Sequence, residues 1–364
     1  MVGHMGQMGL YVKIVSLNVH ISGCKLREDM PEVPGTWETI ATRPFLCYNL
    51  CSEEKVKDLG IIIVNYNTWN FLRDCLTSIY NSQGEFDYQV CVVDNCSTDG
   101  SMEMVQREFP QVHLIASGVN GGFAYANNLG LKAMGFGRES SPGEHGSGGM
   151  SPSNYVLLLN PDTLLLPSAL ADMLAFMGSH PEAGLAGPRL VRPDGSLDLA
   201  CRRSFPTPEV SFYRLTGLSK LFSHSKRFGR YNLTYMDPDQ VAEVDSVSGA
   251  FLMARREAIE QAGLLDESFF MYGEDLDWCY RIKSKGWKVY YNPKVTVLHY
   301  KEASSRGNPK ARYEFYRAMY IFYRKHFATQ TPFWLHWLVI CGIFLRGGIE
   351  LLPTLLRGKF QEKV

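Results

Sequence analysis

The chain has 364 residues, of which 45% are hydrophobic, enough for one large α/β domain with appendages or for two small domains. Its 37 basic and 37 acidic residues cancel, which argues against a nucleic-acid-binding protein, because such proteins usually carry a strong basic excess. The nine cysteines include no Cys-x-x-Cys pair, so the sequence indicates reduced thiols of a cytoplasmic protein rather than a disulfide framework or a zinc site.

Residues 1–57 show no strong periodicity and no motif, and we interpret them as an N-terminal extension of unknown role. The apolar stretch at residues 10–19 is interrupted by Lys13, Ser16 and Asn18, so it does not predict a signal peptide. No apolar run reaches the ~18 residues that a membrane-spanning helix requires. We therefore expect a chain without a transmembrane helix.

Short apolar runs alternate with helical patterns from residue 59 onward. The runs are rich in β-branched residues, which predicts buried strands, and the segments between them carry apolar residues on one face, which predicts helices. Strands are expected at residues 60–65, 89–94, 112–116 and 155–160, and helices at 68–80, through 102–105, and from 120–122 toward 134. A Gly-, Ser- and Pro-rich insertion at 135–153 precedes the fourth strand. This order predicts an α/β fold with a Rossmann-like, mostly parallel sheet flanked by helices.

The segment after the fourth strand is less regular. Helices are expected at residues 167–177, 257–262 and 275–284, and strands at 183–190, 249–255, 288–291 and 296–300. Residues 200–240 are aromatic and basic without a usable period, so we expect them to be irregular.

Polar side chains follow each of the four predicted strands of the first half. Open parallel sheets bind ligands at the carboxyl ends of their strands, so these side chains predict a site for a polar ligand. The residues are Asn65 and Asn67, then Asp94, Asn95 and Ser97, then Asn120, Gly121 and Gly122, and finally Asn160 and Asp162.

Each of these motifs has an ordinary alternative. Asp94 fits a helix cap, or a carboxylate that accepts hydrogen bonds from a nucleobase or ribose. Gly121 and Gly122 fit a turn, or a helix start at which backbone amides approach a phosphate. Asp162 fits the turn that ends a strand, or a carboxylate that holds Mg²⁺ or Mn²⁺ together with substrate phosphates.

A second cluster contains three acids within four positions, Glu274, Asp275 and Asp277, directly after an aromatic run. Acids are favourable in the first turn of a helix, which explains one or two of them but not the aromatic run. In a partly apolar pocket, desolvation raises a carboxylate pKa and suits a general base. His299 also follows a predicted strand, and although a lone histidine is usually structural, this position favours a metal ligand.

Taken together, these motifs resemble family 2 glycosyltransferases. The matching runs cover residues 63–67, 92–101, 120–130, 157–162, 247–253 and 270–277. Within the family, the pattern is similar to bacterial rhamnosyltransferases that build O-antigen or other cell-envelope glycans. The resemblance implies a GT-A fold over residues 58–300, with a nucleotide-sugar-binding half at 58–165 and an acceptor and catalytic half at 166–300.

The resemblance also implies a role for each motif. Asp94 would contact the base or ribose of the donor nucleotide. Asp162 would hold a divalent cation, Mg²⁺ or Mn²⁺, with His299 and the diphosphate, because asparagine replaces the first acid of the family's Asp-x-Asp motif. Asp275 matches the general base, and Glu274 supports it or takes its place. The remaining positions implied for the nucleotide sugar are Asn65, Asn67, Asn95, Ser97, Asn120, Gly121, Gly122, Asn127 and Asn160.

The implied reaction is inverting transfer of L-rhamnose from dTDP-rhamnose to a hydroxyl of a glycan or of a polyprenyl-diphosphate-linked acceptor. The same fold would serve a UDP- or GDP-linked galactose, galactofuranose, glucose or mannose. A non-catalytic nucleotide-sugar-binding scaffold is disfavoured by the intact acids Asp162, Glu274 and Asp275. An NAD-dependent enzyme is disfavoured because no Gly-x-Gly-x-x-Gly follows the first strand.

Residues 301–364 differ from the rest of the chain. They contain eleven Lys and Arg against four Glu, a net charge of +7 by 11 − 4, together with aromatic and aliphatic runs at 313–327 and 333–345. This composition favours a helical tail at the cytoplasmic face of the inner membrane. The alternative is a C-terminal helix that packs on the domain or on a second copy of the chain in a homodimer.

Overall fold

The computed structural model describes residues 56–137, 150–301, 309–348 and 351, all within one unit that spans residues 54–364. The predicted N-terminal extension lies outside the described residues except for its last two positions. Residues 138–149 of the predicted insertion, and residues 302–308, 349–350 and 352–364 of the predicted tail, also lie outside them.

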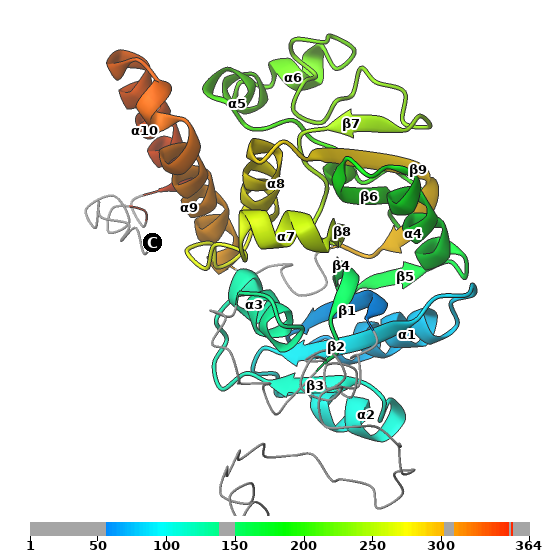
Figure 1. Cartoon of the computed structure of the whole chain (residues 1–364). Helices are drawn as coiled ribbons and strands as arrows, with labels where there is room; N and C mark the ends of the chain where they lie inside the picture. Colours follow the sequence, from blue (N-terminus) through cyan, green and yellow to red (C-terminus); the bar gives the residue numbers. More distant parts are fainter. Residues whose placement is uncertain (1–55, 138–149, 302–308, 349–350, 352–364) are drawn as a thin grey trace, which may run out of the picture. The chain divides into compact units, whose positions relative to one another are not determined.

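A nine-stranded mixed sheet runs through the described unit (Figure 1). Its strands follow the order β3-β2-β1-β4-β8-β6-β9-β5, and β7 pairs with β9. The strands are β1 (Lys57–Asn65), β2 (Tyr88–Asp94), β3 (His113–Ala116), β4 (Ser153–Leu159), β5 (Thr163–Leu165), β6 (Ala183–Val191), β7 (Ala242–Val244), β8 (Phe251–Arg255) and β9 (Lys288–His299).

Ten α-helices and two short 3₁₀ segments are described alongside the sheet. The first helices are α1 (Trp69–Tyr80), α2 (Ser101–Glu108), α3 (Phe123–Ala133), α4 (Ala169–Ser179), α5 (Pro208–Leu215) and α6 (Leu218–Leu221). The later ones are α7 (Arg256–Ala262), α8 (Glu274–Ser284), α9 (Pro309–His326) and α10 (Phe333–Gly347), and the 3₁₀ segments are Leu199–Cys201 and Ala328–Gln330.

The predicted α/β fold is confirmed, and four neighbouring parallel strands form the first half of the sheet. Strands β1 to β4 are mutually parallel, and Asn65 pairs in register with Asp94, which aligns the carboxyl ends of β1 and β2. The apolar run in β1 is fully buried because β1 lies between β2 and β4 in the sheet and α3 packs on it. Gly130 of α3 lies directly on this run, where a Cβ atom would come within 2.7 Å of Ile62.

The second half of the sheet departs from the sequence expectation. β8 runs antiparallel to both β4 and β6, so the sheet is mixed, and the two strands expected at 288–291 and 296–300 form one strand, β9. The stretch expected to be irregular at 200–240 contains α5 and α6. α5 begins at Pro208, and the Thr207 side chain caps it by accepting from the Val210 N–H at 3.3 Å. This cap is local, and the hydrophobic periodicity of the sequence does not predict it.

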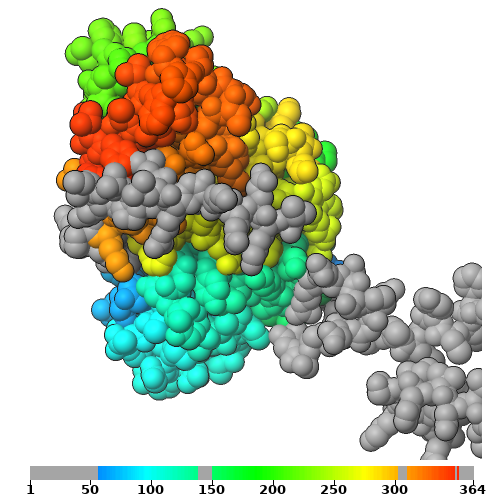
Figure 2. All heavy atoms as spheres, turned by 90° about the vertical axis from the view of Figure 1, so that its left-hand side faces the viewer, coloured from blue at the N-terminus to red at the C-terminus, as the bar shows by residue number. Residues whose placement is uncertain are grey.

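The last two described helices form a pair on one side of the domain. α9 packs on the segment around α8, with Ile321 and Phe322 buried against Phe269 and Leu276. α10 packs on α9 in turn. In Figure 2 the orange and red atoms of these helices lie above the cyan atoms of the first half. No helix among the described residues is long and apolar enough to cross a membrane.

Candidate active site

Side-chain hydrogen bonds join the ends of β1 and β2. The Asn65 Nδ2 group donates to Asp94 Oδ1 at 2.9 Å and to Ser97 Oγ at 3.0 Å. The Ser97 N–H donates to Asp94 Oδ2 at 2.8 Å. Asp94 is only 1% exposed, so its carboxylate holds the loop after β2 in place. Its expected contact with a donor nucleotide stays a prediction.

Asn67 ties the loop after β1 to the loop after β2. Its Oδ1 atom accepts from the Thr98 N–H at 2.8 Å, and its own N–H donates to Ser97 Oγ at 3.0 Å. Asn67 has a left-handed backbone, with φ of 54°, which asparagine tolerates better than most residues. Asparagine at position 67 therefore suits both the left-handed backbone of the turn and the hydrogen bond to Thr98.

The next strand end is joined to the same network through Asn95. Its Nδ2 group donates to Asn120 Oδ1 at 2.9 Å, and its Oδ1 atom accepts from the Gly121 N–H at 3.1 Å. The Gly122 N–H donates to Asn120 Oδ1 at 3.2 Å. The strand-end residues of β1, β2 and β3 thus form one connected, mostly neutral cluster.

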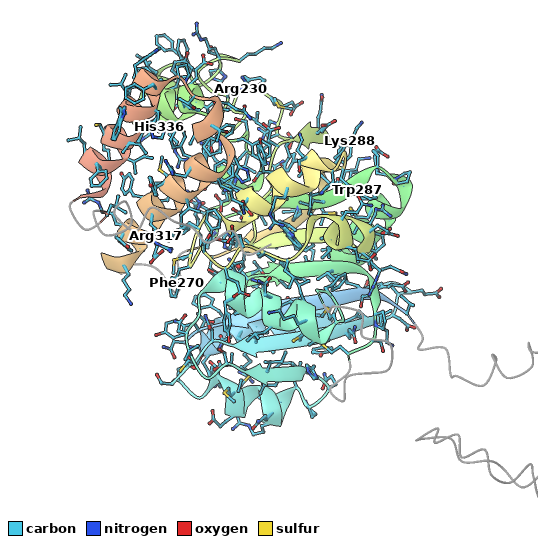
Figure 3. The ribbon with its side chains drawn as sticks, turned by 60° about the vertical axis from the view of Figure 1, so that its left-hand side comes forward. Arg230, Phe270, Trp287, Lys288, Arg317 and His336 are labelled. Carbon is cyan, nitrogen blue, oxygen red and sulfur yellow. The ribbon has the colours of Figure 1, made fainter. Side chains whose placement is uncertain are left out.

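Gly122 lies at a close contact between the two halves of the domain. Its φ is +90°, and a Cβ atom there would lie 2.4 Å from the carbonyl oxygen of Phe270. The Phe123 N–H donates to that same carbonyl at 2.8 Å. Since the N–H groups of Gly121, Gly122 and Phe123 all donate within the protein, the glycines here permit the halves to meet rather than present free amides to a phosphate. Figure 3 shows Phe270 at this junction.

Two asparagines retain free side-chain capacity beside this junction. Asn127 is 1% exposed and donates from Nδ2 to the Phe123 carbonyl at 2.9 Å, while its Oδ1 atom is buried without a partner among the described residues. Asn160 is half-buried, and its backbone N–H donates to the Ala250 carbonyl at 3.0 Å. Both remain candidates for contact with a nucleotide sugar.

The candidate metal residues Asp162 and His299 are brought together by strand pairing. Thr163 at the start of β5 pairs in register with His299 at the end of β9. The Asp162 Oδ1 atom lies 3.4 Å from His299 Nε2, and each residue is 6% exposed. The other ring nitrogen, Nδ1, lies 3.2 Å from Asp198 Oδ2.

This pair fits the edge of a divalent-cation site. Adjacent ligands of an octahedral ion with ~2.1 Å bonds lie about 3 Å apart, close to the separation of Asp162 Oδ1 and His299 Nε2. A carboxylate behind the ligating histidine, as Asp198 provides, is the usual arrangement at metal sites. No group of three or more ligating side chains occurs among the described residues, so donor phosphates and water would complete the coordination.

The carboxylates around His299 also control its protonation in the metal-free protein. Burial alone would lower the pKa of His299, but hydrogen bonds to Asp162 and Asp198 outweigh burial and raise it to about 9. Burial would raise the pKa of Asp198, but His299 and Lys301 hold it well below its ordinary value. A cation bound at Nε2 would therefore have to displace a proton.

Asp275, the expected general base, is held by two groups that sequence analysis did not single out. Arg203 donates to Asp275 Oδ2 at 2.6 Å, and the Gly249 N–H donates to the same oxygen at 3.1 Å. Among the described residues, the Asp275 Oδ1 atom accepts only from the Leu276 N–H, at 2.7 Å. The side chains of Arg203 and Asp275 are 10% and 12% exposed. Asp275 is thus oriented at one oxygen and keeps capacity at the other.

Glu274 lies beside Asp275 but in a different environment. It is 7% exposed, and its Oε2 atom has no partner among the described residues. Burial, and then the neighbouring Asp275 carboxylate, raise the pKa of Glu274 well above the ordinary value. Glu274 is therefore favoured as the neutral acid, whereas Asp275 is paired with the Arg203 guanidinium.

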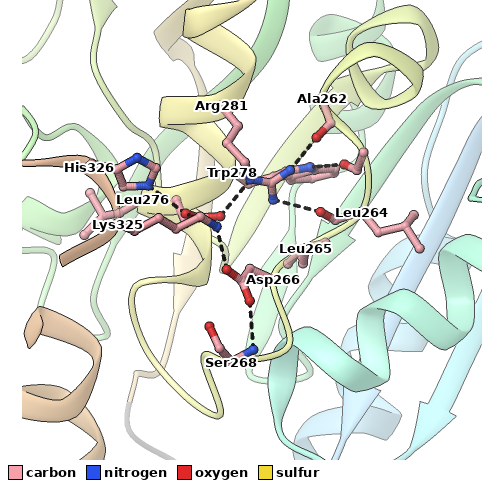
Figure 4. Close-up of polar contacts among 12 residues, drawn as sticks. Ala262, Leu264, Leu265, Asp266, Ser268, Leu276, Trp278, Arg281, Lys325 and His326 are labelled. Carbon is pink, nitrogen blue, oxygen red and sulfur yellow. Dashed lines mark hydrogen bonds and ion pairs between the residues drawn. The ribbon is translucent and has the colours of Figure 1, made fainter. Parts of the chain in front are cut away.

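Asp277, the third acid of the cluster, is structural. It is fully buried and accepts from Arg281 at 2.8 Å and from His326 at 2.7 Å, and it lies 2.9 Å from the Lys325 ammonium. Figure 4 shows Arg281, Lys325 and His326 near one another, with dashed lines for the polar contacts in this region. Burial would raise the pKa of Asp277, but these partners hold it well below its ordinary value. Asp277 therefore fastens α9 to α8.

Short contacts connect Asn160, at the end of β4 just before Asp162, to Asp275. The Asn160 N–H reaches the Ala250 carbonyl, and the neighbouring Gly249 N–H reaches Asp275. A Cβ atom on Gly249 would lie 3.5 Å from the Asp275 Cβ and 3.6 Å from the Phe123 ring. The ends of β4, α3 and α8 therefore converge around one point at the carboxyl edge of the sheet.

Sequence reasoning missed Arg203 and Asp198. Arg203 lies in the stretch expected to be irregular, and Asp198 begins a 3₁₀ turn without any motif. A single sequence carries no signal for either residue, because their partners lie 72 and 101 positions away.

We compared the chain with family models and with known proteins, and one family model matches it. The family model "Glycosyl transferase family 2" matches residues 60–261. An N-acetylglucosaminyl-diphospho-decaprenol L-rhamnosyltransferase of Mycobacterium tuberculosis (strain ATCC 25618 / H37Rv) is 27% identical over 305 residues, 84% of this chain and 96% of the relative. Rhamnosyltransferase WbbL of Escherichia coli (strain K12) is 26% identical over 68% of this chain and 85% of the relative.

A solved structure shares the fold. The crystal structure of GalNAc-T7 with UDP, GalNAc and Mn²⁺ superposes with a TM-score of 0.50 at 14% sequence identity. The superposition covers 77% of this chain and 52% of the other. At this identity the likeness extends to the fold alone, and with the matched family it gives the sheet and its flanking helices the GT-A architecture.

Proposed function

The chain belongs to glycosyl transferase family 2, and we propose that it is an inverting transferase that moves L-rhamnose from dTDP-rhamnose to a hydroxyl of a polyprenyl-diphosphate-linked sugar. Two relatives that span most of the chain are named as rhamnosyltransferases, and one of those names includes a diphospho-decaprenol acceptor. The observation that carries the proposal is the chain of contacts that leads from Asn160, two residues before Asp162, through Ala250 and Gly249 to Asp275.

Asp275 is the general base in this proposal. Arg203 and Gly249 bind its Oδ2 atom, which leaves Oδ1 to receive the proton of the acceptor hydroxyl as that oxygen attacks the anomeric carbon. The sugar gains oxocarbenium character in the transition state, as in glycoside cleavage. Attack from the face opposite the leaving nucleotide inverts the anomeric centre.

Glu274 limits the negative charge at the base. As the neutral acid, it avoids a second anion beside Asp275 as the nucleoside diphosphate leaves. A neutral carboxyl group can also donate a hydrogen bond, whereas an ionised one can only accept.

Asp162 and His299 would hold Mg²⁺ or Mn²⁺ in this proposal. A bound cation would neutralise charge on the diphosphate of the leaving group. Asp198 orients the His299 ring through Nδ1, and the asparagines of the β1 to β3 loops would bind the nucleoside.

We also propose that α10 lies on the cytoplasmic face of the membrane. Five of its apolar side chains are between 53% and 87% exposed, namely Phe333, Trp334, Trp337, Leu338 and Leu345. They share one face, since α10 packs on α9 through the opposite one. An exposed apolar face with tryptophans is typical of a helix at the membrane interface.

A vesicle experiment tests the position of α10. Replacement of Trp334, Trp337 and Leu338 by glutamine should release the full chain from anionic vesicles in a sedimentation assay. Continued sedimentation of the folded triple variant would contradict the membrane position.

A donor screen tests the transferase proposal. The full chain is incubated with dTDP-rhamnose, UDP-galactose, UDP-glucose or GDP-mannose, with Mn²⁺, and with an N-acetylglucosaminyl-diphospho-polyprenol, and products are identified by mass spectrometry. We expect a product that carries one added rhamnose in the inverted configuration. A product that carries galactose, glucose or mannose would show that the protein is a glycosyltransferase with a donor sugar other than rhamnose. Failure to transfer from any donor, in a protein stabilised by none of the nucleotides, would reject the proposal.

A further inference from the structure

A pocket of about 430 Å³ lies outside the candidate active site, between α5 and the segment that follows α6. Tyr213 and Tyr235 line it together with the basic side chains Lys226, Arg227 and Arg230. The only acidic lining residue is Glu209. A pocket with this lining is suited to an anion that also has an apolar part.

The pocket keeps unpaired positive charge. Arg227 donates to Glu209 at 3.1 Å and to the Tyr213 hydroxyl at 2.7 Å, so one cation and the one anion neutralise each other. Lys226 and Arg230 make no ion pair with any described residue. The two remaining cations are enough to bind a diphosphate, for which arginine and lysine are the usual protein partners.

Exposed apolar side chains border the pocket. The Tyr213 ring contacts Phe228 at 4.8 Å between centroids, and Phe228 contacts Phe222 at 5.3 Å. Phe222 is 48% exposed and the adjacent Leu221 is 73% exposed. Cations beside an exposed apolar surface match a molecule with a charged head and a hydrocarbon chain.

The same side of the molecule carries the proposed membrane face. Arg346 at the end of α10 donates to the Leu215 carbonyl at the end of α5 at 2.9 Å. Figure 3 shows Arg230 and His336, which belongs to α10, at the same end of the molecule, and in Figure 2 the green and red atoms adjoin there. A lipid in the bilayer could therefore reach the pocket from α10.

The pocket is also connected to Asp275. Tyr231, the neighbour of Arg230, accepts at its carbonyl from the Ser204 N–H at 2.8 Å. Ser204 directly follows Arg203, which binds Asp275. The segment that lines the pocket is thus tied by a hydrogen bond to the segment that orients the base.

We propose that this pocket binds the diphosphate of the lipid-linked acceptor, with Lys226 and Arg230 as its principal contacts. The inference rests on the proposed function and adds the place where the acceptor's charged linkage is recognised. The prenyl chain leaves past Leu221 and Phe222 toward the membrane, and the sugar extends toward Asp275. The enzyme then selects its acceptor by the diphosphate as well as by the sugar.

The test compares two acceptors in the full-length protein. One is an N-acetylglucosaminyl-diphospho-polyprenol, and the other is the same sugar on an alkyl chain of similar length without the diphosphate. The variant is Lys226→Glu with Arg230→Glu, and the matched control is Lys285→Glu, an exposed lysine at the other end of α8 from Asp275. Circular dichroism and thermal unfolding verify that each variant is folded.

We expect the preference of the enzyme for the diphosphate acceptor, as a ratio of kcat/KM values, to fall at least about tenfold in the double variant, because charged hydrogen bonds are lost. Lys285→Glu should keep the wild-type ratio. An unchanged ratio in a folded double variant would overturn the proposal, as would an equal fall in Lys285→Glu.

Vesicle binding separates the pocket from the reaction and from general attraction to anionic lipid. Wild-type protein should bind vesicles with decaprenyl diphosphate more tightly than phosphatidylglycerol vesicles of equal surface charge, and the double variant should lose this difference. Equal binding of the wild type to both vesicles would reject the pocket. If wild-type protein shows the binding difference but transfers no sugar, the pocket stands and the transferase proposal fails.

Discussion

The two halves of the site are held together by different kinds of hydrogen bond. At the ends of β1 to β3, neutral amides and a hydroxyl bind one another and a single carboxylate. The bonded residues lie 25 to 32 positions apart in the sequence, at the ends of successive strands. Around α8 and β9, buried charges are paired instead, as in Arg203 with Asp275. The first arrangement costs little to bury, whereas each ion in the second requires its partner, because an unpaired buried charge is strongly destabilising.

The largest expected effect comes from Asp275→Asn. Loss of the general base should lower kcat by about 10²–10⁴ while donor binding persists, because the nucleotide loops are untouched. Product formation and titration calorimetry with the donor nucleotide measure the two quantities. Near-normal turnover in a folded variant would reject Asp275 as the base.

Asp277→Asn applies the same chemical change two positions away and should have the opposite outcome. It leaves Arg281, Lys325 and His326 around an uncharged side chain, which should cost about 3–5 kcal/mol of unfolding free energy. Urea unfolding measures the loss. Since the partners lower the pKa of Asp277, its contribution is present above the ordinary aspartate pKa and is lost as pH falls through the folded-state value. A variant as stable as wild type at neutral pH would refute the pairing.

Asp198→Asn should weaken the metal site without removing a ligand. Loss of the carboxylate behind His299 typically costs 10–100-fold in metal affinity, so Mn²⁺ binding in the presence of the nucleoside diphosphate should weaken by about that factor. Asp194→Asn, in an exposed turn of the same segment, is the matched control. Equal Mn²⁺ affinity in both variants would show that Asp198 does not orient His299.

Glu274→Gln should have the smallest effect, visible in the pH dependence of stability. The folded state favours neutral Glu274, so its contribution is present below the ordinary glutamate pKa and is lost as pH rises through the raised folded-state pKa. Glutamine cannot ionise, so the variant should become more stable than wild type by about 1 kcal/mol at alkaline pH. Parallel pH profiles of thermal unfolding for the two proteins would contradict the raised pKa.

The same contrast explains how much of the structure was predictable. Strands β1, β2 and β4 are seven to nine residues long and each contains a shorter apolar run, so their existence and most of their boundaries follow from the sequence. β5 has only three residues, too few for any period, although its pairing with β9 brings Asp162 to His299. The antiparallel direction of β8 is equally hidden, because a buried strand looks the same in either orientation.

The candidate site likewise contains residues that the sequence predicts and residues that it does not. The base and the metal pair were predicted because acids and a histidine at strand and helix ends are unusual enough to identify. Arg203 and Asp198 could not be, since an arginine in an aromatic, basic stretch has many possible partners and only the fold selects one. The structural role of Asp277 was also hidden, because its partners Lys325 and His326 come from a helix 48 and 49 positions further along the chain, by 325 − 277 and 326 − 277.

The contact at Gly122 has a consequence for how the protein is made. During synthesis the strands of the first half leave the ribosome early and can begin to pack, since domains form from the N-terminal side onward. The Phe123 N–H, however, can donate to the Phe270 carbonyl only after Phe270 has been synthesised, which happens much later. Until Phe270 has been synthesised, the loop at Gly122 lacks its contact with the second half of the domain. The nascent chain therefore completes the contact at Gly122 only when the acids at the start of α8 are also being added, so a fragment that ends before Phe270 lacks this junction.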